Sequence, residues 1–227
     1  MSMSPPGDPV EAVIFDLDGV LLDSETIWDH ARRALVTRFG GTWRSDATRE
    51  MMGMSSPEWS AYVRDRLGVP LSAEQISSAV VASVEQRYTE QLPLMAGAHD
   101  AVESLAQRWP LGLASSSNRS VIERFLDASD LRSRFRATVS SEEVERGKPA
   151  PDVYLAAAAQ LRAAPESCVA IEDSTNGIRA AVAANMHVVA VPNRHFPPSP
   201  EVLAAAVVVL TDLTSLTPAR IEEAGRR

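Results

Sequence analysis

The sequence predicts an α/β fold: a parallel sheet with helices on both faces, and a small all-helical segment inserted after the first strand. Three observations lead to this prediction. Short apolar runs without alternation recur along the chain, which is typical of strands buried on both faces. Segments of helical character lie between these runs, as in a series of strand–helix–strand units. The interval between residues 26 and 91 breaks that rhythm, because it contains helical segments and no apolar run.

The apolar runs define the candidate strands. They cover residues 12–15, 111–114, 137–139, 168–171 and 188–191, with a sixth candidate at 207–210. The helical segments between them cover residues 98–108, 119–128, 151–161 and 175–184. The last sixteen residues are expected to form a surface helix. This order of elements predicts a Rossmann-like sheet.

The interval after the first strand predicts three helices. They cover residues 26–39, 57–67 and 72–91, and glycines punctuate the segments between them. The interval is longer than a usual crossover connection, so we interpret residues 25–92 as a helical cap domain on a core formed by 11–24 and 93–227. Two crossings between cap and core would make a hinge for a lid. The alternative, that these helices pack on the sheet as one rigid body, stays open. Residues 1–10 are expected to be a flexible lead-in.

Composition limits the possible partners. The chain has 227 residues and a net charge of −8, from 30 acidic and 22 basic residues. This balance argues against a nucleic-acid partner, although a local lysine and a metal could still bind a small anion. The single cysteine, Cys168, excludes a disulfide within the chain and favours a reducing compartment. The chain begins without a signal-like segment, and its longest apolar run, 202–210, is too short to span a bilayer. We therefore expect a cytoplasmic protein without a membrane partner, and favour a monomer.

Polar residues follow four of the predicted strands. They are Asp16 and Asp18 after the first, Ser115, Ser116, Ser117 and Asn118 after the second, Lys148 after the third, and Glu172 and Asp173 after the fourth. Because ligands bind outside the carboxyl ends of parallel strands, these side chains are expected to meet at one edge of the sheet.

This set of residues predicts phosphoryl chemistry. Four carboxylates ionise together only if a cation lies among them, and all-oxygen ligation points to Mg²⁺. A lysine and a hydroxyl beside the metal make a site for a phosphoryl group. One carboxylate can be the nucleophile, and a second, two residues away, can protonate the leaving oxygen and then activate water. Each motif alone also fits an ordinary turn or helix cap. All four in order, each at a strand end, are much harder to attribute to chance.

The same motifs resemble those of a known family. The residues from Phe15 to Glu25 resemble the first signature of the haloacid dehalogenase-like hydrolases. Leu113-Ala114-Ser115 resembles the second motif, Lys148-Pro149 the third and Glu172-Asp173 the fourth. The resemblance extends from about residue 11 to about 192, and the branch it suggests is that of the β-phosphoglucomutase-like phosphatases, which carry a helical cap after the first motif.

The resemblance implies a role for each matched residue. Asp16 would be the nucleophile and a metal ligand, and Asp18 the general acid and base, with its backbone carbonyl on Mg²⁺. Ser115 would hydrogen-bond the phosphoryl oxygens, and Lys148 would pair with Asp16 and the phosphate.

Further roles concern the metal and the substrate. Asp173 would ligate the metal, and Glu172 would do so directly or through water. The candidate substrate contacts are Ser116, Ser117, Asn118, Trp28 and Ser56. Trp28 could equally belong to the cap's own core, with Trp43, Trp59 and Tyr62.

The cap residues bear on whether the protein hydrolyses a phosphosugar or isomerises it as a mutase does. Mutases of this branch hold a second phosphate with basic cap residues. This sequence has Trp28 where a histidine is expected, Ser55-Ser56 near the expected arginine, and 84–86 without the expected lysine. We therefore predict a Mg²⁺-dependent phosphatase acting on a small phosphomonoester, a sugar phosphate or another phosphorylated metabolite, through an aspartyl-phosphate. A β-phosphoglucomutase-like mutase and a phosphoacceptor signalling domain are the alternatives.

Overall fold

A computed structural model describes residues 10–194 and 196–226, so the predicted flexible lead-in falls almost entirely outside the described residues. The described strands form one parallel sheet in the order β3-β2-β1-β4-β5-β6. They are β1 (Ala12–Phe15), β2 (Leu111–Ser115), β3 (Phe135–Ser140), β4 (Cys168–Glu172), β5 (His187–Ala190) and β6 (Val208–Val209).

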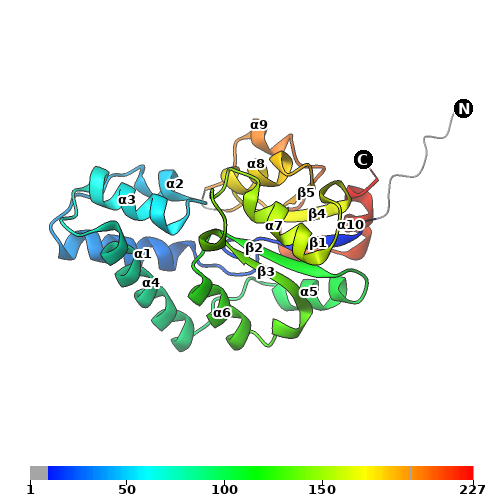
Figure 1. Cartoon of the computed structure of the whole chain (residues 1–227), viewed down its shortest axis with the longest axis horizontal. Coiled ribbons are helices and arrows are strands. Elements are labelled where there is room, and N and C mark those ends of the chain that lie inside the picture. Colours follow the sequence, from blue (N-terminus) through cyan, green and yellow to red (C-terminus); the bar gives the residue numbers. More distant parts are fainter. Residues whose placement is uncertain (1–9, 195, 227) are drawn as a thin grey trace, which may run out of the picture.

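Helices cover both faces of this sheet (Figure 1). The α-helices that follow residues 25–92, called the cap segment from here on, are α5 (Ala98–Ala106), α6 (Arg119–Ala128), α7 (Asp152–Leu161), α8 (Thr175–Ala183), α9 (Pro200–Leu203) and α10 (Pro218–Ala224). Short 3₁₀ turns lie at Arg132–Arg134, Ser141–Glu143, Pro165–Ser167 and Leu213–Ser215.

Alternate residues of each central strand enter two separate cores. In β1, Val13 and Phe15 pack with α5, α6 and α10, whereas Ala12 and Ile14 pack with α7 and α8. All four side chains are fully buried. The central strands β1, β2 and β4 therefore have no solvent-facing side, which is why they show continuous apolar runs in the sequence. The predicted fold class is confirmed.

The predicted elements differ from the structure mainly at the sheet edges and the C-terminus. Strand β3 begins two residues earlier than predicted, because it is an edge strand on which Arg136 is exposed and interrupts the apolar run. Strand β6 has only two residues. The prediction of a surface helix over the last sixteen residues is wrong. That segment holds a 3₁₀ turn and the seven-residue α10, and Ile221 and Ala224 of α10 are fully buried against the sheet.

The cap segment, residues 25–92, contains four α-helices and no named strand. They are α1 (Glu25–Arg38), α2 (Ala47–Met51), α3 (Ser56–Leu67) and α4 (Ala73–Glu90). Helix α2 was not predicted, because five residues carry too little periodicity. Figure 1 shows these helices grouped at one end of the molecule, while α4 also packs against α6 of the core. The division into two hinged domains stays a prediction.

Two sequence features fix the ends of these helices. Ser55 with Glu58, and Ser72 with Gln75, form capping boxes that begin α3 and α4.

Trp59 on α3 is almost fully buried, as expected for the core of the cap segment. None of the described helices combines the length and the apolar character that crossing a lipid bilayer requires.

Helix α8 approaches the end of β4 closely at Gly177. A Cβ atom at this position would lie 1.8 Å from Oε1 of Glu172, the last residue of β4. Glu172 is fully buried and cannot swing into solvent. Glycine therefore sets the distance between α8 and the sheet.

We predict that Gly177→Ala lowers the free energy of unfolding by about 1–3 kcal/mol, because the new methyl group overlaps the Glu172 carboxylate. Helix propensity alone predicts the opposite sign, a gain of about 1 kcal/mol. Chemical denaturation measures the difference. Val182→Ala, at an exposed position of the same helix, is the control and should change stability by less than about 0.5 kcal/mol. A Gly177→Ala variant as stable as the wild type would contradict the prediction.

Candidate active site

The carboxyl ends of the strands and the cap segment enclose one cavity of about 50 Å³. Of the candidate site residues named from the sequence, those lining it are Asp16, Asp18, Trp28, Ser116, Ser117, Lys148 and Asp173. The predicted convergence at one edge of the sheet therefore occurs. Ser56, Ser115, Asn118 and Glu172 do not line this cavity.

Lys148 lies at the centre of the polar cluster below the cavity. Its Nζ donates to Asp16 Oδ1 and to Glu172 Oε1, both at 2.6 Å, and to the carbonyl of Ala114 at 3.1 Å. Burial lowers the pKa of Lys148, but the charges of Asp16 and Glu172 outweigh this effect and raise it above the usual value. Lys148 is therefore a fixed positive charge between β1, β2 and β4.

Three buried carboxylates meet beside this lysine. Oxygens of Asp16, Glu172 and Asp173 lie within 4.8 Å of one another. Burial raises the pKa of Asp16 to about 8, even though the charge of Lys148 lowers it. Burial and the charge of Glu172 also hold the pKa of Asp173 well above its usual value. One lysine does not neutralise this set, and hard oxygen donors at this spacing fit a cation such as Mg²⁺.

Glu172 is already fully hydrogen-bonded within the protein. Its Oε1 accepts from Lys148 and from the Tyr154 hydroxyl at 2.7 Å, and its Oε2 accepts from Asp173 N–H at 3.0 Å and from Ser174. Of the three carboxylates beside Lys148, Asp16 and Asp173 are therefore the two that face the cavity. Whether Glu172 ligates a metal directly or through water stays a prediction.

Asp18 receives hydrogen bonds from both sides of the cavity. Its Oδ1 accepts from Ser24 Oγ at 2.5 Å and from Trp28 Nε1 at 3.1 Å, and its Oδ2 accepts from Ser117 Oγ at 2.5 Å. Trp28 also packs edge-on against Trp59, with ring centroids 6.1 Å apart. Trp28 therefore lines the cavity and also belongs to the cap's core, while its contact with substrate stays a prediction.

The serines after β2 divide their contacts. Ser115 is fully buried, and its Oγ accepts from Ser117 N–H at 3.0 Å. Ser116 Oγ donates to the carbonyl of Gly53 in the cap segment at 2.9 Å. Ser56 Oγ donates to Asn118 Oδ1 at 2.5 Å, so these two residues join the cap segment to the core rather than facing the cavity.

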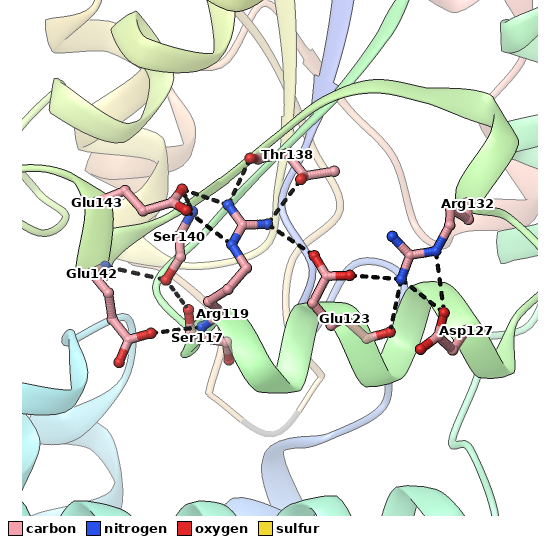
Figure 2. A network of polar contacts seen from close by, with 9 residues as sticks. All are labelled: Ser117, Arg119, Glu123, Asp127, Arg132, Thr138, Ser140, Glu142 and Glu143. Carbon is pink, nitrogen blue, oxygen red and sulfur yellow. Dashed lines mark hydrogen bonds and ion pairs between the residues drawn. The ribbon is translucent and has the colours of Figure 1, made fainter.

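A polar network holds the loop after β2 in place (Figure 2). Arg119, at the start of α6, donates to Glu143 and to both oxygens of Thr138, while Ser140 Oγ donates to the carbonyl of Ser117 at 2.7 Å. Arg119 is therefore a structural residue and not a cavity contact. The network fixes the position of the backbone that carries Ser116 and Ser117.

The structure adds polar residues that sequence reasoning missed. Tyr154 donates to Glu172, and Asn193 Nδ2 donates to Asp173 Oδ2 at 3.1 Å. On α1, Glu25 and Arg32 line the cavity beside Trp28. Burial raises the pKa of Glu25 to about 7, against the opposing charge of Arg32. Glu25, Trp28 and Arg32 are spaced at i, i+3 and i+7, so the helical period was a signal for them once Trp28 was placed.

Arg32 bears on the mutase alternative. The three basic positions of the mutase pattern do lack a basic residue, but it does not follow that the cap segment brings no positive charge to the cavity. Arg32 supplies one from a different position on the same helix.

Comparison with known proteins identifies relatives over most of the chain. The profile of the haloacid dehalogenase-like hydrolases matches residues 13–191. Hexitol phosphatase B of Escherichia coli is 36% identical over 212 residues, covering 91% of this chain and 94% of that protein. The phosphorylated carbohydrates phosphatase of Thermotoga maritima is 34% identical over 179 residues, covering 78% and 82%.

A solved structure shares the fold. The crystal structure of CbbY from Rhodobacter sphaeroides in complex with phosphate has a TM-score of 0.84 and 26% identity, covering 94% of this chain and 99% of that chain. Together with the profile match and the two relatives, this likeness shows that the chain belongs to the haloacid dehalogenase-like hydrolase family, as a phosphoric monoester hydrolase.

Proposed function

We propose that this enzyme is a Mg²⁺-dependent phosphatase that hydrolyses the phosphate monoester of a small carbohydrate through an aspartyl-phosphate on Asp16. One observation carries the proposal: Asp16, paired with Lys148 at 2.6 Å, faces the same cavity as Asp18 and Asp173. The two named relatives that act on a hexitol phosphate and on phosphorylated carbohydrates support the substrate class.

The reaction transfers the phosphoryl group twice, first to Asp16 and then to water. A carboxylate oxygen of Asp16 bonds to phosphorus while the bond from phosphorus to the leaving oxygen breaks, and Asp18 gives that oxygen its proton. Asp18 then takes a proton from water, whose oxygen bonds to phosphorus and displaces Asp16. The products are the free alcohol and inorganic phosphate, and both carboxyl groups return to their starting states.

The surrounding residues prepare these steps. Lys148 offsets the charge of Asp16, so that an anionic nucleophile and an anionic substrate can approach each other. Asp16 and Asp173, with the backbone carbonyl of Asp18, would hold Mg²⁺. When bound, Mg²⁺ would supply positive charge for the phosphoryl oxygens. Ser24, Trp28 and Ser117 orient Asp18.

We further propose that residues 25–92 act as a cap that opens to admit substrate. The cavity of about 50 Å³ is small for a ligand pocket, which supports a closed arrangement. The hydrogen bonds between the cap segment and the core include Ser116 to Gly53, Ser56 to Asn118, and Asn176 Nδ2 to the Met52 carbonyl at 3.0 Å, and α4 packs against α6. A few exchangeable hydrogen bonds of this kind are compatible with reversible opening.

Family membership removes the phosphoacceptor signalling domain from the alternatives. A phosphosugar mutase remains the second candidate, and it would need a site for a second phosphate. In the described part of the cap segment, the cavity receives one basic residue, Arg32, with Glu25 beside it. Hydrolysis is therefore favoured. The cytoplasmic location and the monomer stay predictions.

We predict that Asp16→Asn lowers kcat by at least about 10³-fold, because an amide oxygen is a poor nucleophile for phosphorus. Release of inorganic phosphate from a panel of sugar phosphates in Mg²⁺ measures the effect. Asp23→Asn is the matched control, since Asp23 is exposed, lies in the same segment and does not line the cavity. Phosphate release by Asp16→Asn at the wild-type rate would rule out Asp16 as the nucleophile.

We predict that Mg²⁺ at 100 times its dissociation constant stabilises the wild type by about 2.7 kcal/mol, and that Asp173→Asn abolishes this gain. Without metal, Asp173→Asn should be at least as stable as the wild type, because it removes a charge that burial and Glu172 disfavour. Thermal unfolding with Mg²⁺ and with chelator measures both effects. An unchanged Mg²⁺ response in Asp173→Asn would contradict the assignment.

We predict that the wild type releases phosphate from a hexose phosphate without any added bisphosphate. Phosphate release and isomer formation are followed in the same reaction by NMR. Formation of an isomeric hexose phosphate that requires a bisphosphate primer, without net phosphate release, would establish the mutase instead.

A further inference from the structure

Helix α1 presents three side chains to the cavity from one face. Trp28 follows Glu25 by three residues and Arg32 follows Trp28 by four, so the three side chains share one face of the helix, and all three line the cavity. Seven residues of helix extend about 10 Å, so these side chains provide a wall of molecular length opposite the strand ends. The reaction derived above uses only Trp28 from this wall.

Arg32 is buried in a way that ordinary packing does not explain. The residue is 7% exposed, and its guanidinium carbon lies 5.1 Å from the ring centroid of Trp28 and 4.9 Å from that of Trp59. Its Nε is fully buried and has no hydrogen-bond partner among the described residues. A buried N–H without a partner destabilises a protein.

Glu25 has the complementary property. Its Oε2 is also buried without a hydrogen-bond partner among the described residues. A donor and an acceptor that both lack a partner therefore belong to two neighbouring charged side chains of one cavity. A bound molecule that satisfies both must offer an acceptor and a donor.

Hydroxyl groups meet this requirement, because each can donate and accept. A second anionic group fits less well. The acidic charges acting on Arg32 are those of Glu25, Asp18 and Asp29, so an anion on Arg32 would also approach carboxylates. The rings of Trp28 and Trp59 add apolar surface suited to the C–H groups of a carbohydrate.

We propose that Arg32 and Glu25 bind hydroxyl groups of the leaving alcohol and thereby select monophosphates of neutral polyols over bisphosphates and phosphorylated sugar acids. The inference rests on the proposed function, because it takes this cavity as the place where the phosphate ester is cleaved. Arg32 acts on substrate selection and takes no part in the transfer of the phosphoryl group.

Three six-carbon substrates test the proposal: sorbitol 6-phosphate, 6-phosphogluconate and hexyl phosphate. They carry a neutral polyol, a polyol with a carboxylate, and no hydroxyl group. The wild type should have its highest kcat/KM on sorbitol 6-phosphate. In Arg32→Met, which keeps an unbranched apolar stem beside the tryptophans, the ratio of kcat/KM for sorbitol 6-phosphate to that for hexyl phosphate should fall about 10- to 100-fold.

Arg33→Met is the matched control. Arg33 follows Arg32 on α1 and does not line the cavity. Its guanidinium carbon lies 4.6 Å from the ring centroid of Trp43, and it forms an ion pair with Asp29. Its substitution should leave the ratio within about twofold of the wild type. Thermal unfolding of both variants shows whether each is folded. If Arg32→Met is unfolded, Arg32→Lys and Glu25→Gln replace it, and each should lower the same ratio.

Distinct outcomes would overturn the proposal. Equal losses on sorbitol 6-phosphate and hexyl phosphate would make Arg32 a structural residue. A wild-type preference for 6-phosphogluconate that Arg32→Met removes would make it an anion-binding residue. Wild-type turnover with an unchanged ratio in the folded variants would reject this inference alone, whereas no Mg²⁺-dependent turnover of any phosphomonoester would reject the proposed function.

Discussion

The double ion pair of Lys148 is the interaction on which the rest of the site depends. Burying a lysine and two carboxylates is costly unless the geometry is good and the remaining polar atoms are hydrogen-bonded. Here Nζ lies 2.6 Å from both Asp16 and Glu172 and also donates to the Ala114 carbonyl. Those partners lie at or next to the carboxyl ends of β1, β4 and β2, which are adjacent in the sheet. The strand order therefore brings the three partners within reach of Lys148, and the ion pairs in turn hold the ends of these strands together.

The same cluster creates a need for a further cation. Lys148 offsets part of the charge of Asp16, Glu172 and Asp173, and burial still raises the pKa of Asp16 and of Asp173. A nucleophilic carboxylate must be ionised, so the fold places its nucleophile where additional positive charge is needed to ionise it. A bound Mg²⁺ would supply that charge and would thereby link metal binding to the ionisation of Asp16.

The parts of the site that follow directly from strand ends could be predicted from the sequence. Asp16, Lys148 and Asp173 could be placed together because parallel strands bring their carboxyl ends to one edge. Tyr154 and Asn193 could not, because they reach the cluster from a helix and a loop whose positions depend on packing. The C-terminal prediction failed for a related reason. Ile221 is buried because α10 packs on β5 and β6, and no local sequence pattern reveals that these strands need a helix there.

Helix α1 connects substrate selection with the orientation of the acid. Trp28 donates to Asp18, and Arg32 lies against the same indole ring one turn further along the helix. A leaving group that binds Arg32 would hold α1 in the position from which Trp28 and Ser24 fix Asp18. A substrate that cannot bind Arg32 would not add that support. Specificity of this kind would lower kcat as well as raise KM for a poor substrate, because Asp18 takes its hydrogen bonds from Ser24 and Trp28 at the start of the helix that also carries Arg32.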